Sequence, residues 1–469
     1  MDYLKNLSVV ILAAGKGKRM KSGIPKVLHH ICNQPILYYI LSSINKLNPK
    51  NIFIVVGHKA ELVDEYIASN FPQVKTVYQR NQLGTANAVC VMEDHQKDLG
   101  ENVLILPGDC PLIAINTLKK LVDKKVKTGS TAVVITTILS NPEGYGRIIK
   151  GDNNNVLKIV EEADTTAEEK KINEINSSIY CFDTKSLFIN IKNINSKNSQ
   201  KEYYLTDIVE ELIKKEKKVT CLKTYKSFEV LGINDRIQLA EIEKIMQKTI
   251  NEKLMRNGVT IKDPISCYIG GLVEIGKDSV IEPFCFIKGR SKIESNCIIG
   301  PFSQITDSEV GSGTKINSSV ILGSIIGNNN SIGPYSYIRP GTLTGDNVKV
   351  GAFCEVKKSK INSRSKVPHL SYVGDSEIGS GVNIGASSVT VNYDGYNKNK
   401  TIIEDNVFIG SDTMLVAPVR IGRGAIVAAG SVITQDVPPN ALAIERGSQK
   451  NIKDGAVRYR KKKKEKIEN

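Results

Sequence analysis

The feature that most constrains this chain is an aliphatic residue that returns at every sixth position through much of its second half. Seven isoleucines keep this spacing without interruption: Ile269, Ile275, Ile281, Ile287, Ile293, Ile299 and Ile305. A second unbroken series comprises Ile403, Ile409, Leu415, Ile421, Val427 and Ile433. Between the two series the spacing recurs with shifts of phase. Neither a helix, with a period of about 3.6 residues, nor an amphipathic strand, with a period of about two, gives this pattern.

A coil with three sides does give a six-residue period. Each side is one short strand, one β-branched residue per side points inward, and a small residue turns the corner. Stacked coils bury a continuous aliphatic column, which contributes about 1.5–3 kcal/mol for each fully buried Ile or Val. We therefore predict a parallel β-helix after Gly258, and an all-β sandwich with this spacing by chance is the disfavoured alternative. The period does not determine the handedness of the coil.

Before Gly258 the sequence has a different character. Short apolar runs alternate with helical stretches such as residues 36–47. The runs are residues 9–12, 52–56, 103–106 and 131–137. Buried strands separated by helices predict an α/β domain with a mostly parallel sheet covered on both faces. Apolar residues then recur at every third or fourth position after Arg236, which predicts one helix that ends at Gly258.

The expected organisation is an α/β domain (1–236), a linker helix (237–257), a β-helix domain (258–457) and a basic tail (458–469). The net charge is +15, and the last fourteen residues hold seven Lys or Arg against two Glu. We interpret the tail as a solvated segment. No nucleic-acid partner is predicted, because the other lysines are dispersed without a basic aromatic module.

Nothing in the sequence indicates a membrane or an oxidising compartment. The longest early apolar stretch, residues 9–14, is too short to span a bilayer and lacks a small-residue cleavage site. The nine cysteines include no CxxC pair, which is typical of reduced thiols and not of a disulfide framework or a zinc site. We predict a cytoplasmic protein.

A loop rich in glycine and lysine follows the first predicted strand. It reads LAAGKGKRM from Leu12 to Met20, and Pro25-Lys26 follows shortly after. Small residues let backbone N–H groups approach a phosphate or a base, and the lysines and arginine can neutralise a polyphosphate. In open α/β sheets such loops lie at the carboxyl ends of strands, where ligands bind. The loop is neither a P-loop nor a complete dinucleotide motif, because Met20 replaces the third glycine.

A carboxylate ends another predicted strand. Asp109 follows the apolar residues 104–106 and Pro107-Gly108. Taken alone it would fit a solvated turn. Beside a phosphate-binding loop it is a natural Mg²⁺ ligand, because Mg²⁺ is held by one or two protein oxygens together with substrate phosphates.

In the second half, residues 355–372 and 391–398 interrupt the repeat, and breaks in a repeat map to one functional face. The polar residues at or near them are Arg339, Lys357, His369, Tyr372, Asn383, Asn392 and Tyr393. His369 is the only histidine after residue 95, so a three-histidine zinc site is excluded. A histidine in such a place can take a proton from an attacking amine. A structural histidine is the alternative.

These motifs resemble a known family. The first half is similar to the sugar-1-phosphate nucleotidyltransferases, and the whole chain short of its tail resembles the bacterial bifunctional N-acetylglucosamine-1-phosphate uridyltransferase / glucosamine-1-phosphate N-acetyltransferases. Further motifs that carry the resemblance are QLGT (82–85), GYGRI (144–148), IVEE (159–162), EYYLTD (202–207), GINDR (232–236), PHLSY (368–372) and NYDG (392–395). Pro107 and Glu162 depart from residues that relatives often carry. The resemblance implies a Rossmann-like first domain and a left-handed parallel β-helix with hexapeptide repeats.

The resemblance also implies the roles of individual residues. The nucleotide and the UDP-sugar would be bound by Leu12, Ala13, Ala14, Gly15, Lys26, Gln79, Gly84, Thr85, Gly146, Glu161, Asn176 and Asn234. Asp109 and Asn234 would hold Mg²⁺. His369 would be the catalytic base of acetyl transfer, with Arg339, Lys357, Tyr372 and Asn383 on the sugar phosphate. Acetyl-CoA would be bound by Ala386, Asn392, Tyr393, Ser411, Ala429 and Arg446.

The implied function has two steps. Acetyl-CoA would acetylate the amine of glucosamine-1-phosphate, and UTP would then uridylylate the product, giving UDP-N-acetylglucosamine for peptidoglycan and lipopolysaccharide. A homotrimer would complete each acetyl-transfer site. The main alternative is a nucleotidyltransferase whose β-helix is only regulatory or trimerising; a nucleic-acid-binding assembly rests on the charge alone.

Overall fold

The computed structural model describes residues 5–151 and 155–465. The last four residues of the predicted tail, and residues 1–4 and 152–154 of the predicted first domain, lie outside the described residues. The chain divides into two compact units, Met1–Thr249 and Ile250–Asn469, and the division falls within helix α7 (Arg236–Arg256). Within the described ranges, no helix combines the length and the apolar character that crossing a membrane requires.

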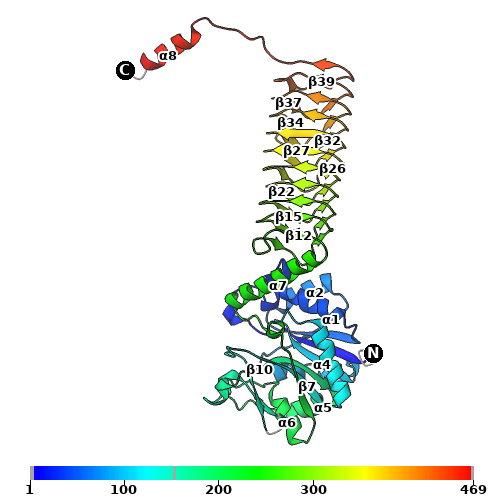
Figure 1. Ribbon diagram of the computed structural model, residues 1–469, viewed down its shortest axis with the longest axis vertical. Helices are drawn as coiled ribbons and strands as arrows, with labels where there is room; N and C mark the ends of the chain where they lie inside the picture. The colour runs from blue at the N-terminus through cyan, green and yellow to red at the C-terminus, as the bar shows by residue number, and fades with distance from the viewer. Residues whose placement is uncertain (1–4, 152–154, 466–469) are drawn as a thin grey trace. The chain divides into compact units, whose positions relative to one another are not determined.

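The first unit is built on one twisted sheet (Figure 1). From edge to edge its strands are β11 (Val219–Lys223), β7 (Ala132–Ile138), β10 (Glu174–Asp183), β6 (Asn102–Pro107), β1 (Leu7–Leu12), β4 (Asn51–Val56) and β5 (Lys75–Tyr78). Four neighbouring pairs are parallel, but β10 runs antiparallel to β6 and β7. The antiparallel pair β8 (Arg147–Lys150) and β9 (Val156–Val160) joins β10. The sheet is therefore mixed, which the sequence could not reveal because a strand buried on both faces has an apolar pattern in either direction.

Helices complete this unit: α1 (Ile36–Asn45), α2 (Ala60–Asn70), α3 (Thr85–Cys90), α4 (Ile115–Thr128), α5 (Thr184–Asn190) and α6 (Asp207–Lys214). Helix α4 shows how the sequence sets them. It buries Leu118, Leu121 and Val122 at helical spacing. It ends at Gly129, whose φ of 61° lies in the left-handed region that glycine adopts without strain.

The second unit is a parallel β-helix, with short strands stacked coil upon coil (Figure 1). Its three sides run from β12 (Thr260–Ile261) to β41 (Leu442–Ala443), from β13 (Tyr268–Ile269) to β40 (Val432–Ile433), and from β14 (Glu274–Ile275) to β38 (Val419–Ile421). The predicted isoleucine column is confirmed. Ile269 pairs with Ile287 and Ile287 with Ile305, so one coil takes 18 residues. The architecture is consistent with the left-handed β-helix of hexapeptide-repeat proteins.

The two predicted interruptions differ in the structure. Val356 pairs in register with Val373, so the coil continues through residues 355–372 and is shortened to 17 residues. Ile378 pairs with Ile403, so the coil that contains residues 391–398 takes 25 residues and carries a true insertion. The phase shifts of the sequence are thus changes in the length of single coils.

A second inward column lies beside the aliphatic one. Two residues before many inward aliphatic positions stands a buried Ser, Thr or Cys, such as Ser279, Cys285 and Ser303. The Ser279 hydroxyl donates a hydrogen bond to the carbonyl of Glu294 at 2.9 Å. Such hydroxyls form hydrogen bonds with backbone groups that are buried at the corners of the coil. A buried polar group without a partner would be destabilising.

Candidate active sites

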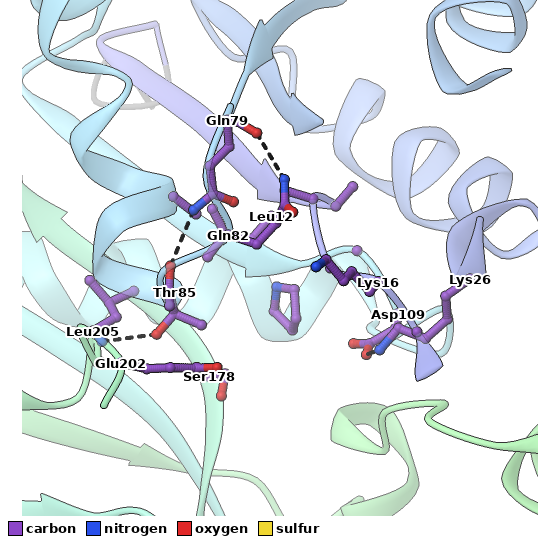
Figure 2. Close-up of a pocket in the computed structure, with 18 of the residues that line it drawn as sticks. Leu12, Lys16, Lys26, Gln79, Gln82, Thr85, Asp109, Ser178, Glu202 and Leu205 are labelled. Carbon is purple, nitrogen blue, oxygen red and sulfur yellow. Dashed lines mark hydrogen bonds and ion pairs between the residues drawn. The ribbon is translucent and has the colours of Figure 1, made fainter. Parts of the chain in front are cut away.

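The first unit holds a cavity of about 710 Å³ whose walls include the segments that follow β1 and β6 at their carboxyl ends. Ten residues predicted to bind the nucleotide, the sugar or the metal line it: Leu12, Ala13, Ala14, Gly15, Lys26, Gln79, Gly84, Thr85, Asp109 and Glu161. Lys16, Lys18 and Arg19 line it too. Figure 2 shows Lys26 and Asp109 at one end of the cavity and Gln79, Gln82 and Thr85 at the other.

The cationic end brings together three residues from distant parts of the sequence. The Lys26 ammonium forms an ion pair with Asp109 Oδ2 and donates to Asn234 Oδ1 at 3.3 Å. The Lys26 and Asp109 side chains are only 18% and 16% exposed. Because two side-chain oxygens already converge on one cation, this donor pair fits a Mg²⁺ ion that takes its other ligands from phosphates and water.

The other end of the cavity is formed in part by Gln79 and the Gly84-Thr85 pair. Gln79 is 2% exposed, and its Nε2 donates to Asn87 Oδ1 at 2.7 Å. Gly84 has a φ of 116°, and a Cβ there would lie 2.5 Å from the carbonyl oxygen of Tyr203. Only glycine therefore allows the backbone at position 84 to lie this close to the backbone of Tyr203.

Glu161 also lines the cavity. Its Oε1 accepts a hydrogen bond from the Thr206 hydroxyl at 3.0 Å, and burial raises the pKa of its carboxyl. Asn176 and Gly146, also predicted to bind the sugar, are not among the residues that line the cavity. Asn176 Nδ2 donates to the Tyr180 hydroxyl at 2.7 Å, and the Asn176 N–H donates to the Gly146 carbonyl at 2.9 Å. Since Tyr180 lines the cavity, Asn176 contacts the wall directly and Gly146 contacts it through Asn176.

In the second unit, neighbouring strands bring the predicted sugar-phosphate residues together. Arg339 follows β25 (Tyr337–Ile338), Lys357 ends β28 (Glu355–Lys357), and Tyr372 begins β31 (Tyr372–Gly374). These three strands are consecutive on one side of the β-helix. His369 is exposed at the end of β30 (Lys366–His369), on the adjoining side, three residues before Tyr372.

Positive charge gathers beside these strands. Arg339 Nη1 lies 2.7 Å from Glu355 Oε1. The ammonium of Lys398 beside Lys357, together with Arg339, lowers the pKa of Lys357, and Asp375 opposes this effect. Like charges are brought this close at a cost, which a bound anion such as a phosphate would offset.

Lys398 comes from the inserted loop. Asn392, at its base, is buried and donates to Asp375 Oδ2 at 2.5 Å. Tyr393 is 58% exposed, and its hydroxyl donates to the Gly395 carbonyl at 2.6 Å. The loop is thus an ordered turn in which Tyr393 is bridged to Lys398, and Lys398 interacts with Lys357.

The remaining candidates form a line along one corner of the β-helix. Ala386 follows β33 (Asn383–Ile384), whose first residue is the predicted sugar contact. The Ala386 carbonyl accepts a hydrogen bond from the Asp412 N–H at 2.7 Å. The Ser411 carbonyl accepts one from the Gly430 N–H at 2.8 Å. Arg446 Nη1 then donates to the Ala429 carbonyl at 3.0 Å. Ala386, Ser411, Ala429 and Arg446 therefore follow one another from coil to coil, as an extended ligand would require.

Comparison with known proteins agrees with both units. Models of the nucleotidyl transferase family, the GMPPB C-terminal domain and the bacterial transferase hexapeptide match residues 8–232, 267–351 and 400–435. The bifunctional protein GlmU of Thermoanaerobacter pseudethanolicus is 50% identical over 98% of this chain and 99% of its own length. Those of Carboxydothermus hydrogenoformans and Clostridioides difficile are 46% and 45% identical over 95% and 98% of this chain, each over 99% of its own length. The chain belongs to the GlmU family.

Membership confirms the prediction from the motifs. A GlmU protein is a bifunctional transferase of UDP-N-acetylglucosamine synthesis, with a nucleotidyltransferase domain and a hexapeptide acetyltransferase domain, so its substrates include a nucleotide and acetyl-CoA. The alternatives of a β-helix that is only a scaffold, and of a nucleic-acid-binding assembly, are not supported.

Some residues at the two candidate sites were not predicted as ligands from the sequence. Ser178, Gln200 and Glu202 line the first cavity, and Lys398 lies in the cationic cluster. Glu202 stands in the EYYLTD motif and Lys398 at the end of the insertion, so each lay within a recognised segment. Ser178 and Gln200 had no such signal.

Proposed function

We propose that the cavity of the first unit binds UTP and N-acetylglucosamine-1-phosphate and catalyses uridylyl transfer. A phosphate oxygen of the sugar attacks the α-phosphorus of UTP, and pyrophosphate leaves. Both reactants are anions, so positioning and charge neutralisation provide most of the rate enhancement and no protein nucleophile is needed. Gln79, Gly84 and Thr85 would hold the uracil, and Lys26 and Arg19 the phosphates. By the resemblance, Gly146, Glu161 and Asn176 would bind the sugar, and of these Glu161 lines the cavity.

Asp109 and Asn234 would hold Mg²⁺. The ion, when bound, neutralises charge on the phosphate oxygens. The observation that supports this assignment is the convergence of both side-chain oxygens on a single cation, the Lys26 ammonium.

We also propose that the β-helix carries the acetyl-transfer site, with His369 as the general base. The amine nitrogen of glucosamine-1-phosphate attacks the thioester carbon of acetyl-CoA. The carbon–sulfur bond breaks, His369 takes the amine proton, and the thiolate of coenzyme A leaves. Arg339 and Lys357 would hold the phosphate, and Tyr372 and Asn383 the sugar. The corner from Ala386 to Arg446, with Asn392 and Tyr393, would bind acetyl-CoA.

The assembly in this proposal is a cytoplasmic homotrimer formed through the β-helix. The acetyl-transfer residues lie on an outer wall, and His369 is exposed, so a neighbouring chain is required to enclose the substrates. Domain boundaries at 1–236, 237–257, 258–457 and 458–469 remain part of this proposal, as does the use of the product for peptidoglycan and lipopolysaccharide.

The decisive experiment supplies the purified chain with glucosamine-1-phosphate, acetyl-CoA, UTP and Mg²⁺, and omits each in turn. Without acetyl-CoA, no UDP-N-acetylglucosamine should form unless N-acetylglucosamine-1-phosphate is added. Without UTP, N-acetylglucosamine-1-phosphate should accumulate. Product formation that does not need acetyl-CoA would contradict the acetyl-transfer assignment.

A further inference from the structure

The position of the Lys26 ammonium bears on how the metal enters the first site. It contacts Asp109 Oδ2 and Asn234 Oδ1, the two oxygens assigned to the divalent cation. A lysine ammonium and Mg²⁺ are both compact cations that prefer oxygen partners. They cannot occupy the same place, so each must exclude the other from these oxygens.

The environment of Asp109 explains why a cation is held there. Its side chain is 16% exposed, and its other oxygen, Oδ1, lies 3.6 Å from the Cys110 thiol. A carboxylate removed from water without a counter-charge is strongly destabilising. The Lys26 ammonium supplies that charge from within the chain.

Lys26 can also bind the nucleotide phosphates without a movement of its backbone. It lines the cavity together with Gly15, Lys16 and Arg19 of the glycine-rich loop. Its flexible four-carbon stem allows the ammonium to move by side-chain rotation alone. Its backbone is fixed by the short helical turn Lys26–Leu28, in which the Lys26 carbonyl accepts from the His29 N–H at 3.2 Å.

We propose that Lys26 and the divalent cation exchange places during the catalytic cycle. Before the metal binds, the ammonium neutralises Asp109 and occupies the side-chain oxygens of Asp109 and Asn234, for which the metal must compete. When the metal binds, the ammonium is released toward the nucleotide phosphates. This inference rests on the proposed uridylyl transfer. It adds that metal and nucleotide bind cooperatively, because the metal displaces the Lys26 ammonium from Asp109 and the nucleotide phosphates bind the displaced ammonium.

The exchange is tested by metal binding without turnover. Mn²⁺ binding to the full-length chain is measured by electron paramagnetic resonance, with and without UTP, for the wild type and for Lys26→Met. Without UTP the variant should bind Mn²⁺ more tightly, by a factor on the order of ten, because the competing cation is gone. With UTP this advantage should disappear. Lys16→Met removes another cation of the same cavity and should not show the gain.

A second measurement needs no substitution. The reactivity of the Lys26 amine toward an acylating reagent, read by peptide mass spectrometry, should rise on addition of Mg²⁺ alone and fall again with UTP. Unchanged or weaker Mn²⁺ binding in a folded Lys26→Met variant, or an amine whose reactivity Mg²⁺ does not raise, would overturn the exchange. A wild type that forms no UDP-sugar from UTP would instead contradict the proposed function.

Discussion

The two candidate sites of this chain differ in how their fold exposes them. The candidate nucleotidyltransferase site lies in a cavity with partly or fully buried residues such as Gln79, Lys26 and Asp109, contributed by segments far apart in one chain. The acetyltransferase candidates lie on the outer wall of a regular β-helix, where His369 and Tyr393 are exposed. The interior of the β-helix is filled by its aliphatic column, so it has no room for a substrate.

This difference teaches where each fold can place chemistry. An irregular α/β fold leaves a hollow at the carboxyl ends of its strands and can enclose a ligand alone. A repeat fold uses its interior for stability and must place ligands outside, at insertions and along corners. The first site should therefore depend on the single chain, and the second on its neighbours. Four substitutions test this separation, from the largest expected effect to the smallest.

Asp109→Ala should have the largest effect. It removes one of the two oxygens proposed to hold Mg²⁺ and leaves the Lys26 ammonium without its partner. We expect uridylyl transfer to fall on the order of 10³-fold or more, while acetyl transfer is unchanged. Both half-reactions are measured on the same preparation. Normal Mg²⁺-dependent UDP-sugar formation by the variant would refute the metal assignment.

His369→Ala should have the complementary effect. Loss of a positioned general base is expected to slow acetyl transfer by about 10²-fold or more. Uridylyl transfer by the same chains should be unaffected. An equal loss of both activities would indicate a folding defect, and undiminished acetyl transfer would assign His369 a structural role.

Lys398→Ala should weaken the binding of the sugar phosphate in acetyl transfer. The ammonium lies beside Lys357 in the cationic cluster, so its loss removes one charge that would face a phosphate. We expect the KM for glucosamine-1-phosphate to rise about tenfold, with a small change in kcat. Lys400→Ala is a matched control, because Lys400, which directly precedes β35 (Thr401–Ile403), pairs with Glu377. Equal KM changes in the two variants would contradict a specific role.

Asp207→Asn should have the smallest effect, on stability alone. Burial, followed by the carboxylates of Glu210 and Asp164, raises the pKa of Asp207 to about 6. Because the folded-state pKa is raised, the stability contributed by the neutral carboxyl is present below about pH 4 and is lost as pH rises through about 6.

The uncharged asparagine should therefore raise the unfolding temperature of the first unit near neutral pH and have little effect near about pH 4. Retention of uridylyl activity after heating is the measurement, with acetyl activity of the same chain as the internal reference. A stabilisation of equal size at both pH values would contradict the assigned cause.

Much of this organisation could be predicted from the sequence because it depends on repeated or local patterns. The six-residue spacing determines the β-helix, since the same inward position recurs in each coil, as Ile269 and Ile287 show. The glycine-rich loop and Asp109 are each recognisable beside a strand. The antiparallel pairing of β10 was not predictable, because the residue pattern of an apolar strand is the same for parallel and antiparallel pairing.

Contacts between distant residues were the other limit. Nothing in the local sequence indicates that Lys26 meets Asp109 and Asn234, or that Lys398 approaches Lys357, because these pairs depend on how strands far apart are ordered. The buried hydroxyls beside the isoleucines were missed for another reason. Ser and Thr are common at exposed turns, so their regular spacing does not by itself indicate burial.

The most direct test of the central claim follows both half-reactions while the chain is diluted through the dissociation of its assembly, with particle mass recorded at each concentration. Uridylyl transfer per chain should stay constant. Acetyl transfer should fall in step with the loss of trimers. A particle with the mass of one chain that retains full acetyl transfer would contradict the account.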